Sequence, residues 1–222
     1  MQATRKQVHD AIQPAAGVGR THASPRPDHS HQSFTWSDVH DAFVQELVDG
    51  RFRSGLRLRD LTLLLIIDSR VHEYPLRGRT IEDGFRFYEE RLGRPLERVQ
   101  TSSGTLDPDE RQLATIARLY AQAAAILERM RTRNPGASPV RLWPHHFDVA
   151  FLIGTIGVGF LAGDDAIDEP YWYVYNTPMP IELPPLSVGE WFRGHWTGAV
   201  LKGDPDAATI EKFLDGAIAG VR

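Results

Sequence analysis

The spacing of apolar residues predicts a helix near the start of the regularly patterned part of the chain. Four apolar residues recur there at helical intervals: Trp36, Val39, Phe43 and Leu47. Thr35 can cap the first turn of such a helix, and Gly50 can end it. We therefore expect ordered structure to begin near Phe34 with one helix that runs to Gly50.

Three later segments have the same helical spacing and carry ordinary start and stop signals. One follows Thr80 as its cap and ends at Gly93. The longest begins at Asp107, where Pro108 suits the first helical position and Glu110 can complete a capping box. The last follows Asp204 and has six apolar residues that we expect in the core: Ile210, Phe213, Leu214, Ala217, Ile218 and Val221.

Short apolar runs bounded by turn residues predict β-strands elsewhere. Residues 61–67 and 71–76 form an expected hairpin, whereas residues 51–60 show no clear period. Five more runs follow Ser138, at residues 140–143, 148–153, 156–161, 171–175 and 196–202. The sequence therefore predicts an α+β fold, in which an antiparallel sheet (an N-terminal hairpin plus a C-terminal meander) packs against several helices.

The first 33 residues contain no continuous apolar run and are rich in Ala, Gly, Pro, Ser, Gln and His. Such a composition buries too little apolar surface to offset the entropy lost on ordering. We expect residues 1–33 to be a disordered tail and residues 34–222 to be a single α+β domain. No internal repeat is evident in the pattern.

Composition narrows the class of protein. The formal net charge of −4 gives no basic surface for nucleic acid, and no apolar run is long enough to cross a membrane. There are no cysteines, so thiolate metal sites, disulfides and cysteine nucleophiles are excluded. No signal peptide is recognised before Ser33, and we expect a cytoplasmic protein.

Histidines, carboxylates, glycines and aromatic residues occur together at high density between Arg141 and Pro178. If residues 145–148 continue a strand, His146 and Asp148 share one face and His145 points to the other. His146 can then act as a general base that Asp148 orients, and we assign Glu169 with them as the candidate catalytic residues. A pair of ligands does not make a metal site, and we predict none.

A strand of alternating tyrosines follows this region. Tyr171, Tyr173 and Tyr175 fall on one face, which can line a ligand pocket, belong to the core or form a dimer surface. The acidic loop before it lacks the spacing of a calcium-binding EF-hand. We assign five candidate ligand-binding residues: Trp143, Asp164, Tyr171, Tyr173 and His195.

The glycines between Gly154 and Gly159 are spaced somewhat like a phosphate-binding loop. Such a loop requires a helix after it, whose N-terminus meets the anion. Here Asp164 and Asp165 follow instead and would repel phosphate. We expect these glycines to permit a tight hairpin or bends in the strands.

The run Leu142-Trp-Pro-His-His-Phe-Asp148, the pair Gly163-Asp164 and the run Glu169-Pro-Tyr-Trp-Tyr-Val174 resemble a bacterial family, domain of unknown function 5996. The resemblance extends over most of the chain after Phe34. It departs at residues 58–64, where the family has a strand rich in His and Trp and this chain has Leu-Arg-Asp-Leu-Thr-Leu-Leu. The resemblance implies the fold and the region of interest and supplies no activity.

Two functions follow from these observations. One is a small-molecule-binding protein or enzyme with a pocket on its antiparallel sheet, since titratable groups cluster among aromatic residues there. The alternative is a non-catalytic interaction or structural domain, which uses the surface of its aromatic strand. The sequence specifies neither a cofactor nor an oligomeric state.

Overall fold

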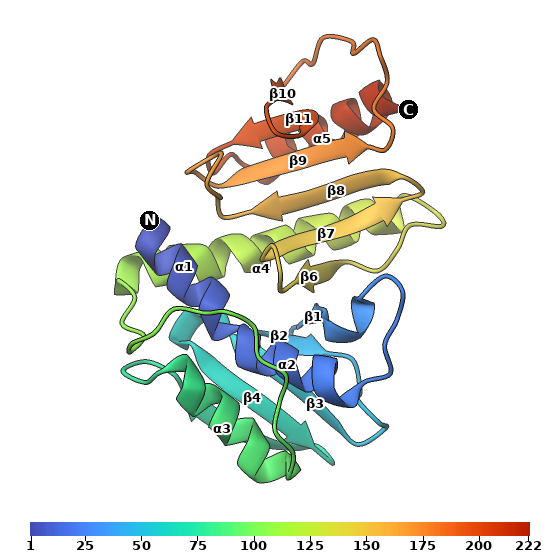
Figure 1. Ribbon diagram of the computed structural model, residues 1–222. Coiled ribbons are helices and arrows are strands. Elements are labelled where there is room, and N and C mark those ends of the chain that lie inside the picture. Colours follow the sequence, from blue (N-terminus) through green and yellow to red (C-terminus); the bar gives the residue numbers. More distant parts are fainter. The chain divides into compact units, whose positions relative to one another are not determined.

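The computed structural model describes residues 1–222 and divides into two compact units. The N-terminal unit comprises Met1–Arg118 and Arg141–Phe147, and the C-terminal unit comprises Leu119–Val140 and Asp148–Arg222. Each unit combines helices with antiparallel strands (Figure 1), so the predicted α+β class is confirmed.

The N-terminal unit holds a sheet with the strand order β6-β1-β2-β3-β4-β5. Its strands are β1 (Phe34–Ser37), β2 (Ala42–Gln45), β3 (Phe52–Arg57), β4 (Thr62–Ile67), β5 (Arg70–Pro75) and β6 (Arg141–Trp143). Its helices are α1 (Gln2–Ala11), α2 (Gln13–His22) and α3 (Ile81–Leu92), with short 3₁₀ turns η1 (Ser30–Gln32) and η2 (Leu58–Asp60). α2 and α3 lie over one face of this sheet (Figure 1).

The C-terminal unit holds strands in the order β7-β8-β9-β11-β10. They are β7 (Asp148–Ile153), β8 (Ile156–Leu161), β9 (Tyr171–Asn176), β10 (Glu190–Arg193) and β11 (Thr197–Lys202). α5 (Ala207–Val221) packs against β8, β9 and β11. The long helix α4 (Glu110–Thr132) is divided between the two units: its residues up to Arg118 belong to the N-terminal unit and those from Leu119 belong to the C-terminal unit.

The predicted helix over residues 35–50 is wrong, because the segment is a β-hairpin. Trp36 pairs with Phe43 across β1 and β2, and Asp41 takes a left-handed conformation (φ 48°) in the turn between them. The helical stripe also fails as a core face, since Val39 is 88% exposed and Leu47 is 50% exposed. Apolar residues spaced three and four positions apart can also occur in a β-hairpin, because the turn between the two strands interrupts the alternation of side chains between the faces of the sheet.

The prediction of a disordered tail is also wrong. α1 and α2 bury a stripe of alanines and branched aliphatic residues that includes Val8, Ala11, Ile12, Ala15 and Val18. Glycine makes this close packing possible: a side-chain carbon on Gly19 would come within 2.4 Å of the His31 carbonyl oxygen. Small residues at helical spacing therefore supplied a core face that composition did not reveal.

Several other predictions are confirmed. β4 and β5 form the expected hairpin, with β5 at the edge of the sheet. Thr80 caps α3 in a capping box with Asp83, and Gly93 ends the helix in a left-handed conformation. The six apolar residues predicted for the core face of α5 are all buried.

Three details differ. Asp109 caps α4 in place of Asp107, since its carboxylate accepts a hydrogen bond from the Gln112 amide at 2.9 Å. Residues 52–57, which have no clear period, form β3. β10 was not predicted, and it pairs beyond β11, so the C-terminal strands depart from a simple meander.

Candidate functional site

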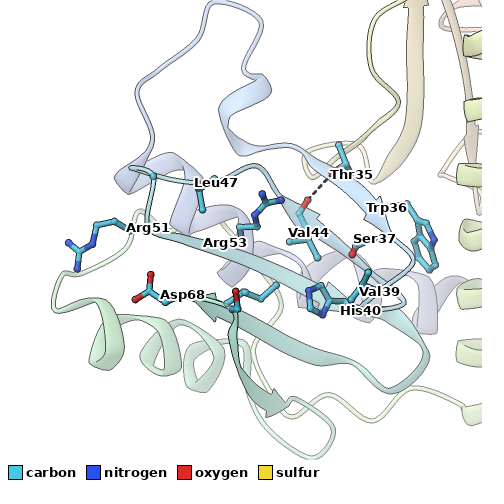
Figure 2. Close-up of a pocket in the computed structure, with 13 residues that line it drawn as sticks. Thr35, Trp36, Ser37, Val39, His40, Val44, Leu47, Arg51, Arg53 and Asp68 are labelled. Carbon is cyan, nitrogen blue, oxygen red and sulfur yellow. Dashed lines mark hydrogen bonds between the residues drawn. The ribbon is translucent and has the colours of Figure 1, made fainter.

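A pocket of about 650 Å³ lies on the face of the N-terminal sheet that α2 and α3 leave uncovered (Figure 2). The ends of β1 to β4 and the loops that connect them line it. The lining residues are Thr35, Trp36, Ser37, Val39, His40, Val44, Leu47, Gly50, Arg51, Arg53, Ile66, Asp68 and Ser69.

Strand alternation explains why an apolar floor forms here. Val44, Gly55 and Leu64 are paired directly across β2, β3 and β4, so their side chains share one face. Ala42, Val44 and Leu64 are buried together there, and Ile66 packs against them. The opposite face packs on helices: the Tyr88 hydroxyl of α3 donates to the carbonyls of Gly55 (3.2 Å) and Leu64 (3.0 Å).

Gly55 allows β2 and β3 to pack closely in this floor. A side-chain carbon at this position would lie within 2.6 Å of the Phe43 carbonyl oxygen, which real structures do not tolerate. Polar groups line the pocket beside the floor, and the Thr35 hydroxyl donates to the Val44 carbonyl at 3.4 Å (Figure 2).

The charged side chains of the pocket are unevenly paired. The side chains of Arg51 and Arg53 have no hydrogen bond or ion pair, and Asp68 is the acidic residue of the lining. In contrast, Arg57 on the same strand bonds Asp60 and Glu73, with 2.7 Å between Arg57 Nη1 and Glu73 Oε1. These bonds, chiefly those that Arg57 donates to Glu73, raise the pKa of Arg57.

The sequence-predicted histidines lie elsewhere, in the turn that follows β6. His145 and His146 do not point to opposite faces, because residues 144–147 form a turn and not a strand. Their ring centroids are 4.3 Å apart, and Phe147 takes a left-handed conformation (φ 59°). Trp143, a predicted ligand-binding residue, ends β6 with its ring 6.1 Å from that of His145.

Side chains of the N-terminal helices hold this turn in place through hydrogen bonds that the sequence does not predict. His9 Nε2 and Gln13 Nε2 both donate to the Pro144 carbonyl, at 2.8 Å and 2.7 Å. The His9 ring also stacks on Phe147, with 5.5 Å between centroids. Burial lowers the pKa of His9 and that of His145, so both rings favour the neutral form.

Asp148 begins β7 in the C-terminal unit, whereas His146 belongs to the N-terminal unit. Within its own unit Asp148 accepts a hydrogen bond of 2.5 Å from the Tyr173 hydroxyl. The Tyr173 ring lies on Gly159, where a side-chain carbon would approach it to 2.4 Å. Burial, with the nearby Asp148, raises the pKa of Tyr173 well above its ordinary value, so the phenol stays neutral and donates.

Asp164 and Tyr171 form a similar pair. The Tyr171 hydroxyl donates to Asp164 Oδ2 at 2.6 Å, while Asp164 Oδ1 accepts from the amides of Ala166 and Ile167, each at 2.8 Å. Burial alone would raise the pKa of Asp164, but these hydrogen bonds outweigh it and lower the pKa. The Asp164 carboxylate therefore stabilises the loop between β8 and β9.

Two predicted residues stand apart from these pairs. Glu169 is exposed in the loop before β9, and His195 is exposed in the β10–β11 turn with its ring 6.1 Å from Phe192. Trp196, next to it, packs its ring 6.2 Å from Tyr173. No three His, Asp or Glu side chains gather in a way that could hold a metal ion.

Gly157 and Gly159 have no side chains and so leave room for the rings of Tyr175 and Tyr173, which pack directly on them. A side-chain carbon on Gly157 would lie within 2.3 Å of the Tyr175 ring. Gly154 occupies the two-residue β7–β8 turn with φ 60°, which confirms the expected tight hairpin. Their role is thus in the packing of the sheet.

Comparison of the chain with protein-family models, with curated proteins and with solved structures finds no match in any of the three. None of the helices combines the length and apolar character needed to cross a membrane. A functional assignment therefore rests on the geometry of the two units.

Proposed function

We propose that this protein binds a small molecule in the pocket on the N-terminal sheet. The observation that carries the proposal is a concave surface of about 650 Å³ with an apolar floor and polar walls. Small-molecule sites commonly measure about 300–1,000 Å³ and combine apolar lining with a few placed polar groups. The pocket expected from sequence is a different one, lined by residues between Trp143 and Tyr173, and none of them lines this pocket.

The exposed apolar side chains at the rim support the same proposal. Val39 is 88% exposed and Leu47 is 50% exposed, and both line the pocket. Each would lose contact with water if an apolar ligand filled the space, at about 25 cal/mol per Å² of apolar surface buried. A ligand with an apolar body therefore fits this site.

The site expected from sequence remains a separate prediction. In the C-terminal unit the four residues Asp148, Tyr173, Asp164 and Tyr171 hydrogen-bond to one another in pairs. Tyr171 is 2% exposed and Tyr173 is 7% exposed. This burial favours a packing role for these two phenols, so the alternative of an interaction surface rests on Tyr175 and its neighbours.

The relation to domain of unknown function 5996 and a cytoplasmic location are further parts of the proposal. The first rests on the runs around Trp143, Asp164 and Tyr171, and the second on a composition without cysteine. Neither supplies a reaction. We accordingly propose binding, with no chemical step assigned.

An uncharged fluorescent probe, N-phenyl-1-naphthylamine, tests binding. We expect saturable binding of one probe per chain. Ser37→Trp should abolish it, because Ser37 lines the pocket and an indole would fill the space. The control is Ser187→Trp, an exposed serine in the loop before β10.

Both variants are checked for unchanged far-UV circular dichroism and urea midpoint. Saturable binding that is lost only in Ser37→Trp supports the proposal. Absence of binding to the wild-type protein, or equal binding by both variants, would overturn it.

A further inference from the structure

We infer that the ligand of the pocket is an anion, with a carboxylate, sulfonate or phosphate group on an apolar body. This inference rests on the proposed function and adds the chemical class of the ligand. The residue that carries it is Arg53, which projects from β3 into the pocket (Figure 2).

The state of Arg53 differs from that of its neighbours. Arg57, four residues later on the same face, is held by two carboxylates, and Arg59 pairs with Asp41. Arg53 has neither a carboxylate nor a carbonyl within hydrogen-bonding distance. Its guanidinium therefore retains all five N–H donors for a ligand, in a planar arrangement that matches a bidentate carboxylate or phosphate.

The surroundings favour an anion that also has an apolar part. Arg53 pairs with Ile66 across β3 and β4, so its aliphatic stem stands beside the apolar floor. Thr35, which pairs with Val44 across β1 and β2, lies on the same face, but its hydroxyl already donates to the Val44 carbonyl. The arrangement would place an acid group at Arg53 and an apolar body over Val44 and Ile66.

Two other charged residues, Arg51 and Asp68, line the pocket. Arg51 stands at the rim and points away from the other lining side chains (Figure 2). Asp68 lies in the β4–β5 turn and opposes an anion. With two arginines against one aspartate, the permanently charged and acidic side chains of the lining have a positive balance.

A matched pair of probes separates the charge from the apolar body. 8-Anilinonaphthalene-1-sulfonate has the skeleton of N-phenyl-1-naphthylamine plus a sulfonate. We expect the wild-type protein to bind the sulfonate about five- to tenfold more tightly at low salt, with the advantage shrinking as salt is added. Fluorescence titration at several salt concentrations measures both dissociation constants.

Variants assign the effect to Arg53. Arg53→Gln should remove the advantage of the sulfonate and change binding of the neutral probe less than about twofold, since its stem remains. Arg111→Gln is the control, because Arg111 is an exposed and unpaired arginine on α4 of the same unit. Asp68→Asn should strengthen binding of the sulfonate.

The outcomes distinguish the two proposals. If the neutral probe binds and the sulfonate binds no better, the anion inference fails while the proposed function stands. If Arg53→Gln and Arg111→Gln weaken the sulfonate equally, Arg53 is not the anion site. If neither probe binds to the wild-type protein, both proposals fail.

Discussion

Substitution of Gly159 by alanine tests how the tyrosine face of the C-terminal unit is packed. The added carbon would lie 2.4 Å from both Cζ and the hydroxyl oxygen of Tyr173, so the ring must move or strain. Overpacking of this kind costs about 1–3 kcal/mol. If the ring moves, it gives up the hydrogen bond to the buried Asp148, which is worth about 1.5–3 kcal/mol.

These two costs are alternatives, so they do not add in full, and we expect Gly159→Ala to lower the free energy of unfolding by about 2–3 kcal/mol. Urea unfolding followed by far-UV circular dichroism measures it. Gly216→Ala is the control: Gly216 is exposed in α5 with nothing within 4 Å of an added carbon. It should stabilise the protein by about 0.5–1 kcal/mol through helix propensity.

A double variant sharpens the test. Tyr173→Phe alone should also destabilise, because Asp148 loses its phenol donor. Combined with Gly159→Ala the two losses should sum to less than their separate values, since both act through one ring. A neutral Gly159→Ala, or strictly additive losses, would refute this account of the packing.

Three further predictions concern the N-terminal unit. Asp109→Ala should cost about 1 kcal/mol in urea unfolding, whereas Asp107→Ala should change stability little, because Asp109 caps α4. The pKa of His9 is lowered by burial, so the unfolded chain binds the proton first, and stability should fall as the pH drops below about 6.5. His9→Gln can keep the bond to Pro144 and should reduce that pH dependence; an unchanged profile would contradict it. Bonds to Arg141 and Arg26 outweigh desolvation and lower the pKa of Glu46, so its contribution to stability should be present above about pH 4.5 and be lost on further acidification. Glu46→Gln should remove that part of the acid transition.

Elements with both a strong period and clear end signals were predictable from sequence. α3 has a cap and a terminal glycine, and α5 has six apolar positions at helical spacing, all of them buried. The β4–β5 hairpin combines an apolar run with a polar turn. Local signals were sufficient there because tertiary packing agreed with them.

The errors arose where local pattern and tertiary packing disagree. The β1–β2 hairpin carries a helical pattern whose members Val39 and Leu47 turn out to be exposed. α1 and α2 looked too poor in large apolar residues to fold, yet their small residues pack closely, as at Gly19. Neither the turn at Asp41 nor the contacts of Gly19 could be derived from spacing alone.

The candidate sites show the same limit. Asp148, Asp164, Tyr171 and Tyr173 are all candidates from the sequence, but the hydrogen bonds that join them in pairs depend on the register of β9. The pocket on the N-terminal sheet was not predictable from the sequence, because Arg53 and Ile66 meet only when β3 and β4 pair. The unpaired arginine at residue 53 was visible in sequence only as one of several in a basic stretch.

The central claim is that the N-terminal pocket binds a small molecule, and methyl NMR tests it most directly. Isoleucine methyl groups are labelled, and the protein is titrated with 8-anilinonaphthalene-1-sulfonate. We predict saturable shifts at Ile66, which lines the pocket, and no shift at Ile181, which is 98% exposed in the C-terminal unit. Equal shifts at both residues, or shifts confined to Ile181, would contradict the claim.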